Sequence, residues 1–455
     1  MKNRFNIFIL SIFGIAFLTG CEDFLNEKSD KKLAVPTTLN DFQALLNHGD
    51  LSSNYCTAGE VSSDDFYVPD ANLNSLSYPQ NKRLYSWQPE YVSMPLSSGY
   101  NEWFNCYRVI FVCNTVLDAI EKNGTFGAEA NNVKGQALAI RAFRLLDGAQ
   151  VWIPAYNTET SHKDLGMVLR LNPDMTLPSV RSSVKQTYEQ IISDLNTAIP
   201  LLPDVQPGPS LPTRATAYGI LARTHLFMGE YEKALLNARE AINKKDNLID
   251  FNSLDPNASL PIPFVKASSE ELIFRTIFSS EILMQPVAKI SESLYALYHE
   301  NDLRKQIYFR KNTDNSYSFR ATHTNNLAAL TCGITTSELF LIIAESSVRL
   351  NRLSEAAEAL NHLLIKRWRN NTYAPYEFTD KDSALKIILT ERRKELVFRG
   401  LRWADLKRLN RDGANITLTR TVDGQTHTLR PNDPRYAIAI PEEVIELSDI
   451  LPNPR

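Results

Sequence analysis

The chain has 455 residues, 43% of them hydrophobic and 22% charged, a composition that is ordinary for a folded globular protein. Its formal net charge of -3 argues against a nucleic-acid-binding protein, whose binding face would carry clustered lysine and arginine. Its five cysteines lack the spacing of a zinc site, and the sequence contains no phosphate-binding loop, zinc-hydrolase motif or serine-nucleophile motif, so we assign no catalytic residue, metal or cofactor.

The chain begins with a segment that is typical of a secretory signal. A basic start is followed by Phe5–Leu18, a mostly apolar run of fourteen residues, which is shorter than the ~20 residues that a membrane-spanning helix needs. The run ends in L-T-G-C at residues 18–21, which resembles the lipobox of bacterial lipoproteins. We therefore predict that residues 1–20 are a signal peptide and that Cys21 is lipidated. An ordinary secretory signal that happens to precede a cysteine is the alternative.

The next stretch is polar and then irregular. Residues 21–35 are expected to form a flexible tether, and 36–455 a single domain that starts with a helix over Leu39–Leu46. Residues 52–98 follow as a long segment rich in Ser, Asn and Pro, and long loops on a rigid scaffold often carry binding functions. An aromatic ring can stack on the C–H face of a sugar while polar groups bond its hydroxyls. The candidate ligand residues here are Asp65, Tyr67, Tyr85, Trp87 and Tyr91, with packing onto the helices as the alternative for each ring.

Three amphipathic helices are expected after this segment. The first two, Gly99–Lys122 and Lys134–Trp152, should lie antiparallel around a turn that contains glycine. The third, Val184–Leu202, has Ser182 or Ser183 as its cap, and its apolar stripe predicts that Asp194 and Asn196 face outward. The cysteines of the first helix, Cys106 and Cys113, are expected to pack in the core.

A helical hairpin then occurs twice, at Arg214–Ile242 and Thr336–Leu364. Ala222 aligns with Ala344, where two helices must come close, and Gly229 aligns with Asn351 at the turn, where a left-handed conformation is least costly for these residue types. The spacing resembles the tetratricopeptide repeat, a ~34-residue helical hairpin that needs neighbours to bury its apolar face. We therefore predict a mainly α fold, a tetratricopeptide-like scaffold with long loop-rich insertions and a few short β-hairpins.

Residues 247–331 interrupt the helical array between the two copies. They contain a strand-like run, Glu271–Phe278, and patches rich in Tyr, Phe and Asn. Insertions in a repeat array tend to lie on one face, which is often the binding face. Tyr308, Tyr317 and Arg320 are therefore further candidate ligand residues, again with packing as the alternative.

The region Asp382–Leu409 is predicted to be the last helix, and it is dense in charge. Glu391 and Glu395 could form a catalytic carboxylate pair, but each has basic neighbours three or four residues away, which keep an acid ionised and unsuited to donating a proton. Glu395 and Arg399 have the spacing of a helix ion pair, worth ~0.2–0.5 kcal/mol. Gly400 is expected to break or bend this helix.

Two further features are expected near the C-terminus. Trp403, beyond the break, is predicted to pack on the repeats. Ile416–Leu429 alternates apolar or threonine residues with polar ones around an Asp-Gly pair, which predicts a β-hairpin.

Residues 391–408 also carry a recognisable pattern. Their sequence, E-R-R-K-E-L-V-F-R-G-L-R-W-A-D-L-K-R, resembles the E-R-R-x-E-L-x-F-E-G-x-R-W-x-D-L-x-R signature of the SusD/RagB family. The family's W-x3-Y-x2-I-x3-N helix resembles residues 103–114, its R-A-x helix resembles 141–143, and a further segment resembles 181–203. Closing I-P and N-P pairs occur at 440–441 and 453–454. Arg399 and Ala404 depart from the signature, which indicates a divergent member.

The resemblance implies a lipidated protein of the outer membrane, exposed at the cell surface, that captures an oligosaccharide and passes it to a SusC-like TonB-dependent transporter. The acidic residues after Cys21 are similar to the export signal of such lipoproteins. Two other functions stay open: the same kind of uptake component for peptides, and a lipid-anchored glycoside hydrolase. The resemblance leaves the identity of the ligand and of the transporter undefined, since ligand-facing loops are where relatives differ.

Overall fold

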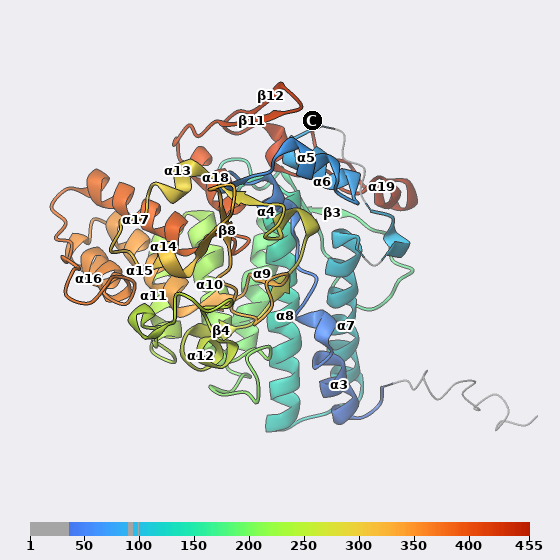
Figure 1. The fold of residues 1–455 in the computed structure, drawn as a ribbon. Coiled ribbons are helices and arrows are strands. Elements are labelled where there is room, and N and C mark those ends of the chain that lie inside the picture. The colour runs from blue at the N-terminus through green and yellow to red at the C-terminus, as the bar shows by residue number, and fades with distance from the viewer. Residues whose placement is uncertain (1–35, 90–93, 99) are drawn as a thin grey trace, which may run out of the picture.

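Helices dominate the computed structural model, which describes residues 36–89, 94–98 and 100–455 (Figure 1). The predicted lipidation site Cys21 and the candidate ligand residue Tyr91 lie outside these residues. The long helices are α7 (Glu102–Lys122), α8 (Ala128–Trp152), α9 (Val184–Ala198), α10 (Arg214–Met228), α11 (Tyr231–Ile242), α15 (Thr336–Arg349), α16 (Leu353–Leu364), α17 (Lys381–Glu395) and α18 (Arg402–Arg411). The predicted class, a mainly α fold built on helical hairpins, is confirmed.

Shorter elements connect these helices. The short helices include α3 (Leu39–Leu46), α4 (Ala58–Ser62), α5 (Asp70–Asn74), α6 (Pro79–Tyr85), α12 (Phe264–Lys266), α13 (Glu292–Tyr295), α14 (Arg304–Ile307) and α19 (Glu442–Ser448). The strands form antiparallel pairs: β1 (Phe66–Tyr67) with β6 (Lys289–Ile290), β2 (Leu165–Val168) with β3 (Arg181–Ser183), β4 (Leu272–Phe274) with β10 (Ile334–Thr335), β5 (Ile277–Phe278) with β9 (Leu330–Thr331), β7 (Phe309–Lys311) with β8 (Tyr317–Phe319), and β11 (Leu418–Val422) with β12 (Gln425–Leu429).

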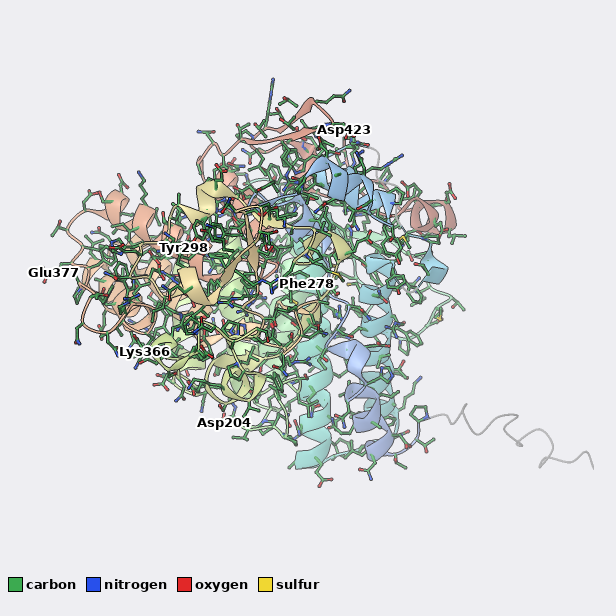
Figure 2. The ribbon with its side chains drawn as sticks, viewed as in Figure 1. Asp204, Phe278, Tyr298, Lys366, Glu377 and Asp423 are labelled. Atoms are coloured by element: carbon green, nitrogen blue, oxygen red, sulfur yellow. The ribbon has the colours of Figure 1, made fainter. Side chains whose placement is uncertain are left out.

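Across the described ranges, no helix combines the length and the apolar character that crossing a membrane would require. Side chains fill the space between the helices, with the buried Phe278 and Tyr298 in the middle of the view and the exposed Asp204 and Glu377 at its edges (Figure 2).

The first two long helices pair as predicted, although their starts differ. Asn101 caps α7, since its side-chain oxygen accepts a 3.0 Å hydrogen bond from the backbone N–H of Phe104, so α7 begins at Glu102. α8 begins six residues earlier than predicted, at Ala128. Cys106 and Cys113 are fully buried free thiols, which confirms their place in the core.

The predicted orientation of one residue on α9 is wrong. Ser183 caps α9 as predicted, and Asn196 is exposed. Asp194, however, is buried and accepts two hydrogen bonds from the Arg141 guanidinium of α8, at 2.8 and 2.7 Å. A carboxylate at the edge of an apolar stripe can face inward when a cation on the neighbouring helix donates hydrogen bonds to it. The local sequence pattern does not show whether such a cation is present.

Both repeats form helical hairpins with the predicted turns. Gly229 (φ 81°) and Asn351 (φ 61°) each follow the first helix of their hairpin in the left-handed conformation. Ala222 and Ala344 have no exposed surface. α11 of the first hairpin packs against α15 of the second, so the two hairpins cover each other's apolar faces.

The predicted last helix, Asp382–Leu409, is two helices. α17 ends at Glu395 and α18 starts at Arg402. Gly400, at φ 72°, lies within the break as expected, and Phe398 is also left-handed at φ 57°. The break separates Glu395 from Arg399, so the predicted ion pair does not form: Arg399 instead donates to the carbonyl of Thr331.

Two other C-terminal predictions have different outcomes. Trp403 is buried against Gly59 of α4, and its ring centroid lies 4.7 Å from that of Tyr436; both of these contacts lie outside the repeats. The hairpin around residues 423–424 is confirmed as β11 and β12. The predicted strand-like run Glu271–Phe278 divides into β4 and β5, each of which pairs with a different later strand.

Candidate functional site

The structure places two of the candidate aromatic residues in the interior. Tyr85 and Trp87 are 2% and 5% exposed. The Trp87 indole N–H donates to the carbonyl of Ser62 at 2.9 Å, and the Tyr85 hydroxyl accepts from the backbone N–H of Val68 at 2.9 Å. Their rings face the guanidinium of Arg420. In this conformation both rings hold the segment 61–87 together and neither offers a face to a ligand.

Asp65 is also buried, in an ion-pair group with its neighbour Asp64. The Arg393 guanidinium donates to Asp65 at 2.7 Å and to Asp64 at 3.1 Å, and Arg402 donates to Asp64 at 2.7 and 2.9 Å. Burial raises the pKa of Asp64, but Arg402 and Arg393 outweigh it and lower that pKa overall. The two carboxylates therefore join the segment 52–98 to the residues around the α17–α18 break.

Tyr308 and Arg320 hold the 247–331 insertion in place. Tyr308 is 4% exposed, and its hydroxyl lies 3.4 Å from the carbonyl of Glu395. Arg320 is 7% exposed and donates to the carbonyls of Ala258 and Gln306, at 3.0 and 2.6 Å. The polar groups of both side chains therefore bond to other parts of the protein.

Tyr67 and Tyr317 are different, because both reach the surface. Tyr67 on β1 is 39% exposed and lies opposite Lys289 of β6 in the strand register. Tyr317 on β8 is half-buried and stacks on Tyr295 of α13, with ring centroids 3.8 Å apart and planes inclined by 17°. Lys289 lies 3.8 Å from Asp314, in the turn that leads to Tyr317. The sequence separates Tyr67 from Tyr317 by 250 residues, and in the structure the pair of Lys289, opposite Tyr67, with Asp314, near Tyr317, links the two strand pairs.

We call Tyr67, Tyr295, Tyr317, Lys289 and Asp314 the tyrosine platform. Burial and a hydrogen bond with Tyr317 raise the pKa of the Tyr295 hydroxyl. Burial, Asp314 and Glu292 raise the pKa of Tyr67, so these hydroxyls stay protonated at neutral pH. The platform combines aromatic faces with hydroxyl donors, one cation and one carboxylate.

Sequence reasoning missed Tyr295. It lies in a mixed apolar stretch with no motif around it, and only its stacking on Tyr317 marks it. The available signal was a tyrosine within the predicted insertion, and that signal alone does not distinguish a binding residue from a packing residue.

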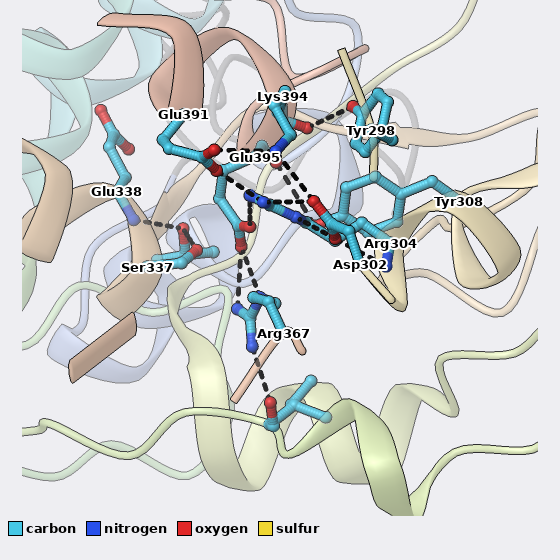
Figure 3. Close-up of polar contacts among 12 residues, drawn as sticks. Tyr298, Asp302, Arg304, Tyr308, Ser337, Glu338, Arg367, Glu391, Lys394 and Glu395 are labelled. Carbon is cyan, nitrogen blue, oxygen red and sulfur yellow. Dashed lines mark hydrogen bonds and ion pairs between the residues drawn. The ribbon is translucent and has the colours of Figure 1, made fainter. Parts of the chain in front are cut away.

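Behind the insertion lies a buried group of charges that we call the charged junction (Figure 3). Arg304 has no exposed surface and bonds three carboxylates, those of Asp302 (2.7 Å), Glu391 (2.5 Å) and Glu395 (3.1 Å). Arg367 donates to Glu395 at 2.8 Å. The junction consists of Glu271, Asp302, Arg304, Arg367, Glu391, Lys394 and Glu395.

The junction's carboxylates are paired with cations rather than placed for catalysis. Lys394 lies 2.9 Å from Asp302 and 2.7 Å from Glu391. Burial raises the pKa of Asp302, but Arg304 and Lys394 lower it to about 2. Glu391 and Glu395 are likewise buried against Arg304, so neither faces a ligand that it could protonate.

A hollow of about 390 Å³ lies along the outer side of α7. Its polar groups are used within the protein: Asn114 donates to the carbonyls of Arg170 and Asn172, and Arg170 donates to Asp174 and Ser179. Its remaining lining is largely apolar and includes Trp103, Phe104, Tyr107, Phe111, Val168, Met175, Val444 and Ile450. Sugar hydroxyls would find few free partners in this hollow.

The described part of the chain contains no group of three or more His, Cys, Asp or Glu side chains arranged to hold a metal ion.

Comparisons with known proteins agree with this architecture. A family profile with the description "Starch-binding associating with outer membrane" matches residues 23–226, and the profile of the SusD family matches 295–442. The SusD-like protein P2 of Formosa agariphila is 24% identical over 421 residues, which cover 77% of this chain and 79% of that protein.

Solved structures share the fold. A putative sugar binding protein from Bacteroides vulgatus has a TM-score of 0.75 at 21% identity and covers 92% of this chain and 99% of its own. A SusD superfamily protein from Bacteroides thetaiotaomicron has a TM-score of 0.73 at 23% identity and covers 92% and 100%. The two profiles together span the helices on both sides of the insertion, in agreement with the signature at residues 391–408. The chain belongs to the SusD/RagB family.

Proposed function

We propose that the protein is a surface lipoprotein of the outer membrane that binds oligosaccharide on the tyrosine platform and delivers it to a SusC-like TonB-dependent transporter. Family membership supports the uptake role, and a relative in the same fold is described as a sugar binding protein. The observation that carries the proposal for this chain is the platform, where the 39% exposed Tyr67 and the half-buried Tyr295–Tyr317 stack are linked by Lys289 and Asp314.

The chemistry of the platform suits a sugar. Aromatic faces stack on the C–H side of a pyranose ring, and the hydroxyls of Tyr67 and Tyr317, with Lys289 and Asp314, can bond the ring's hydroxyl groups. Binding needs no covalent step, and the buried, ion-paired state of the junction's carboxylates favours a protein that holds its ligand without cleaving it. We place all of this in a single domain over residues 36–455, anchored through Cys21.

The proposal is tested by affinity electrophoresis of the purified protein in gels that contain soluble starch, xylan or laminarin, and by calorimetry with casein peptides. We expect retardation by at least one of the three polysaccharides. Tyr317→Ala should then weaken binding about tenfold, the equivalent of about 1.4 kcal/mol. Tyr100→Ala, which removes a 68% exposed tyrosine outside the platform, is the matched control and should bind as the wild type does.

Three outcomes would count against the proposal. Binding of peptides alone would make the protein a peptide-uptake component. Release of reducing ends from a bound polysaccharide would make it a hydrolase. Equal affinities of Tyr317→Ala and the wild type would remove the platform from the site.

The anchor and the partner have their own test. Mass spectrometry of the protein from its native membrane should find acyl chains on Cys21, and purification in mild detergent should recover a TonB-dependent transporter with it. A free thiol at Cys21 would contradict the anchor, and recovery of the protein alone would contradict the stable pairing.

A further inference from the structure

Arg420 is a buried cation whose acceptors are main-chain carbonyls. It lies on β11, is 8% exposed, and donates to the carbonyl oxygens of Val61, Ser63 and Tyr85. Burial lowers its pKa to about 10, so the guanidinium stays charged at neutral pH. All three carbonyls belong to the segment 61–87, which is more than 300 residues away in the sequence.

Aromatic rings of the same segment surround this guanidinium. Its carbon lies 3.9 Å from the ring centroid of Tyr85, 4.7 Å from that of Trp87 and 5.5 Å from that of Phe66. Cation–π contacts of this kind are worth about 2 kcal/mol or more when they are desolvated. The rings that suggested a ligand site in the sequence therefore bind a cation of the same chain.

The consequence for the platform follows from the geometry of β1. Successive side chains of a strand point to opposite sides, and β1 has only two residues. Phe66 is 2% exposed on the side of Arg420, so Tyr67 is turned outward, where it is 39% exposed. The Tyr85 hydroxyl, on the ring nearest to Arg420, also accepts the N–H of Val68, directly after β1.

We propose that Arg420 is a positioning residue for ligand binding: it organises the segment 61–87 so that Tyr67 is held outward on the tyrosine platform. This inference rests on the proposed function of the platform. The C-terminal hairpin thereby controls a surface formed by the N-terminal third of the chain and by the insertion.

A second contact at the tip of the hairpin supports this arrangement. Asp423 accepts from Lys82 of α6 at 2.8 Å and from Asn74 of α5 at 2.9 Å. The tip lies beside these two helices at the top of the view (Figures 1 and 2). The hairpin therefore holds the segment at two points, one buried and one exposed.

Lysine should replace Arg420 poorly. A guanidinium is planar, so it can stack on rings while its N–H groups reach separate carbonyls, whereas an ammonium group is a compact point charge. Arg420→Lys keeps the charge and loses this geometry, and Arg420→Met loses both. Arg430→Met, at an exposed position directly after the hairpin, is the matched control.

The experiment combines two readouts on the purified full-length protein. Hydrogen exchange, measured by mass spectrometry without ligand, should rise in peptides from 61–87 in Arg420→Met and stay unchanged in peptides from α10, α11, α15 and α16. Affinity for soluble starch, xylan and laminarin, measured well below the unfolding temperature, should fall about tenfold in Arg420→Met and less in Arg420→Lys. Arg430→Met should match the wild type in both.

The outcomes separate this inference from the proposed function. Unchanged hydrogen exchange over 61–87 in Arg420→Met overturns the inference. The inference also fails if exchange rises in Arg420→Met but its affinity stays that of the wild type, while Tyr67→Ala loses affinity. If Arg420→Met does not fold, Arg420→Lys decides by the same two readouts. The function of the platform is refuted if the wild type binds none of the three polysaccharides. It is also refuted if Tyr67→Ala and Tyr317→Ala both bind as the wild type does. In either case this inference fails as well.

Discussion

The repeats and the charged junction use buried charge to different extents. In the repeats, Ala222 and Ala344 have no exposed surface, and the buried Arg223 of α10 donates to Glu338 of α15 at 2.7 and 2.6 Å, which joins the two hairpins. In the junction, α17 meets the insertion through Arg304, which is buried among three carboxylates. An apolar crossing depends on the volume of its side chains, whereas a desolvated cation requires its partners in place. The repeats therefore combine apolar fit with a buried ion pair, whereas the attachment of the insertion depends on a network in which one cation serves three carboxylates.

The largest expected effect comes from breaking the junction. Arg304→Met should lower the free energy of unfolding by about 3–5 kcal/mol, because it leaves Asp302, Glu391 and Glu395 buried with too few cations. Urea unfolding followed by circular dichroism measures the loss. Arg310→Met, at an exposed position on β7, is the control and should change little. A loss below about 1 kcal/mol for Arg304→Met would show that the junction does not need its central cation.

A smaller effect is expected from overfilling a repeat. Ala222→Leu and Ala344→Leu should each cost about 1–3 kcal/mol, because the added carbons enter a fully buried crossing. The two losses should be similar, since the residues are equivalent in the two hairpins. Thermal unfolding of both variants checks this, and a large cost at one position with none at the other would contradict their structural equivalence.

The smallest predicted effect is on how stability changes with pH. It comes from Glu60, a buried acid that has no cation among its hydrogen-bond partners. Glu60 accepts from the N–H of Gly400 at 2.9 Å, and burial together with Asp65 raises its pKa to about 8. The folded state therefore keeps this proton up to about pH 8, while the unfolded state loses it above about pH 4.5. Because the unfolded state binds fewer protons in that window, Glu60 makes stability fall as the pH rises from about 4.5 to 8.

Glu60→Gln tests this sign directly. The amide oxygen can still accept from Gly400, but the side chain no longer titrates. Between pH 7 and pH 8 the wild type should lose about 1 kcal/mol more than the variant, when chemical unfolding is measured at both values. Parallel pH profiles of the two proteins would show that Glu60 is already ionised in the folded state.

The scaffold was predictable because its signals are local. Alanine at the crossing, glycine or asparagine at the turn and a 3.6-residue apolar period lie within about 30 residues of one another, and the structure confirms both hairpins. The outward orientation of Asp194 was wrong for the opposite reason, and the expected break at Gly400 is longer than a single bend. The partner of Asp194 lies on another helix, and the left-handed Phe398 extends the break beyond its glycine.

The site was predictable only in part. Tyr67 and Tyr317 were recognised as aromatic residues in irregular segments, and the structure adds that Lys289 and Asp314 link them and that Tyr295 stacks on Tyr317. The same rule also selected Tyr85 and Trp87, whose rings pack on Arg420. Composition alone cannot distinguish a ring that is free to bind a ligand from a ring that packs on a cation more than 300 residues away. The distinction depends on long-range strand pairing and on the position of the C-terminal hairpin.

A crystal structure of the protein with the polysaccharide fragment that it retains best would show whether ligand binds on the tyrosine platform. We expect a sugar ring stacked on Tyr317 or Tyr67, with its hydroxyls near Lys289 or Asp314. A sugar seated in the hollow along α7, with the platform bare, would rule out binding on the platform.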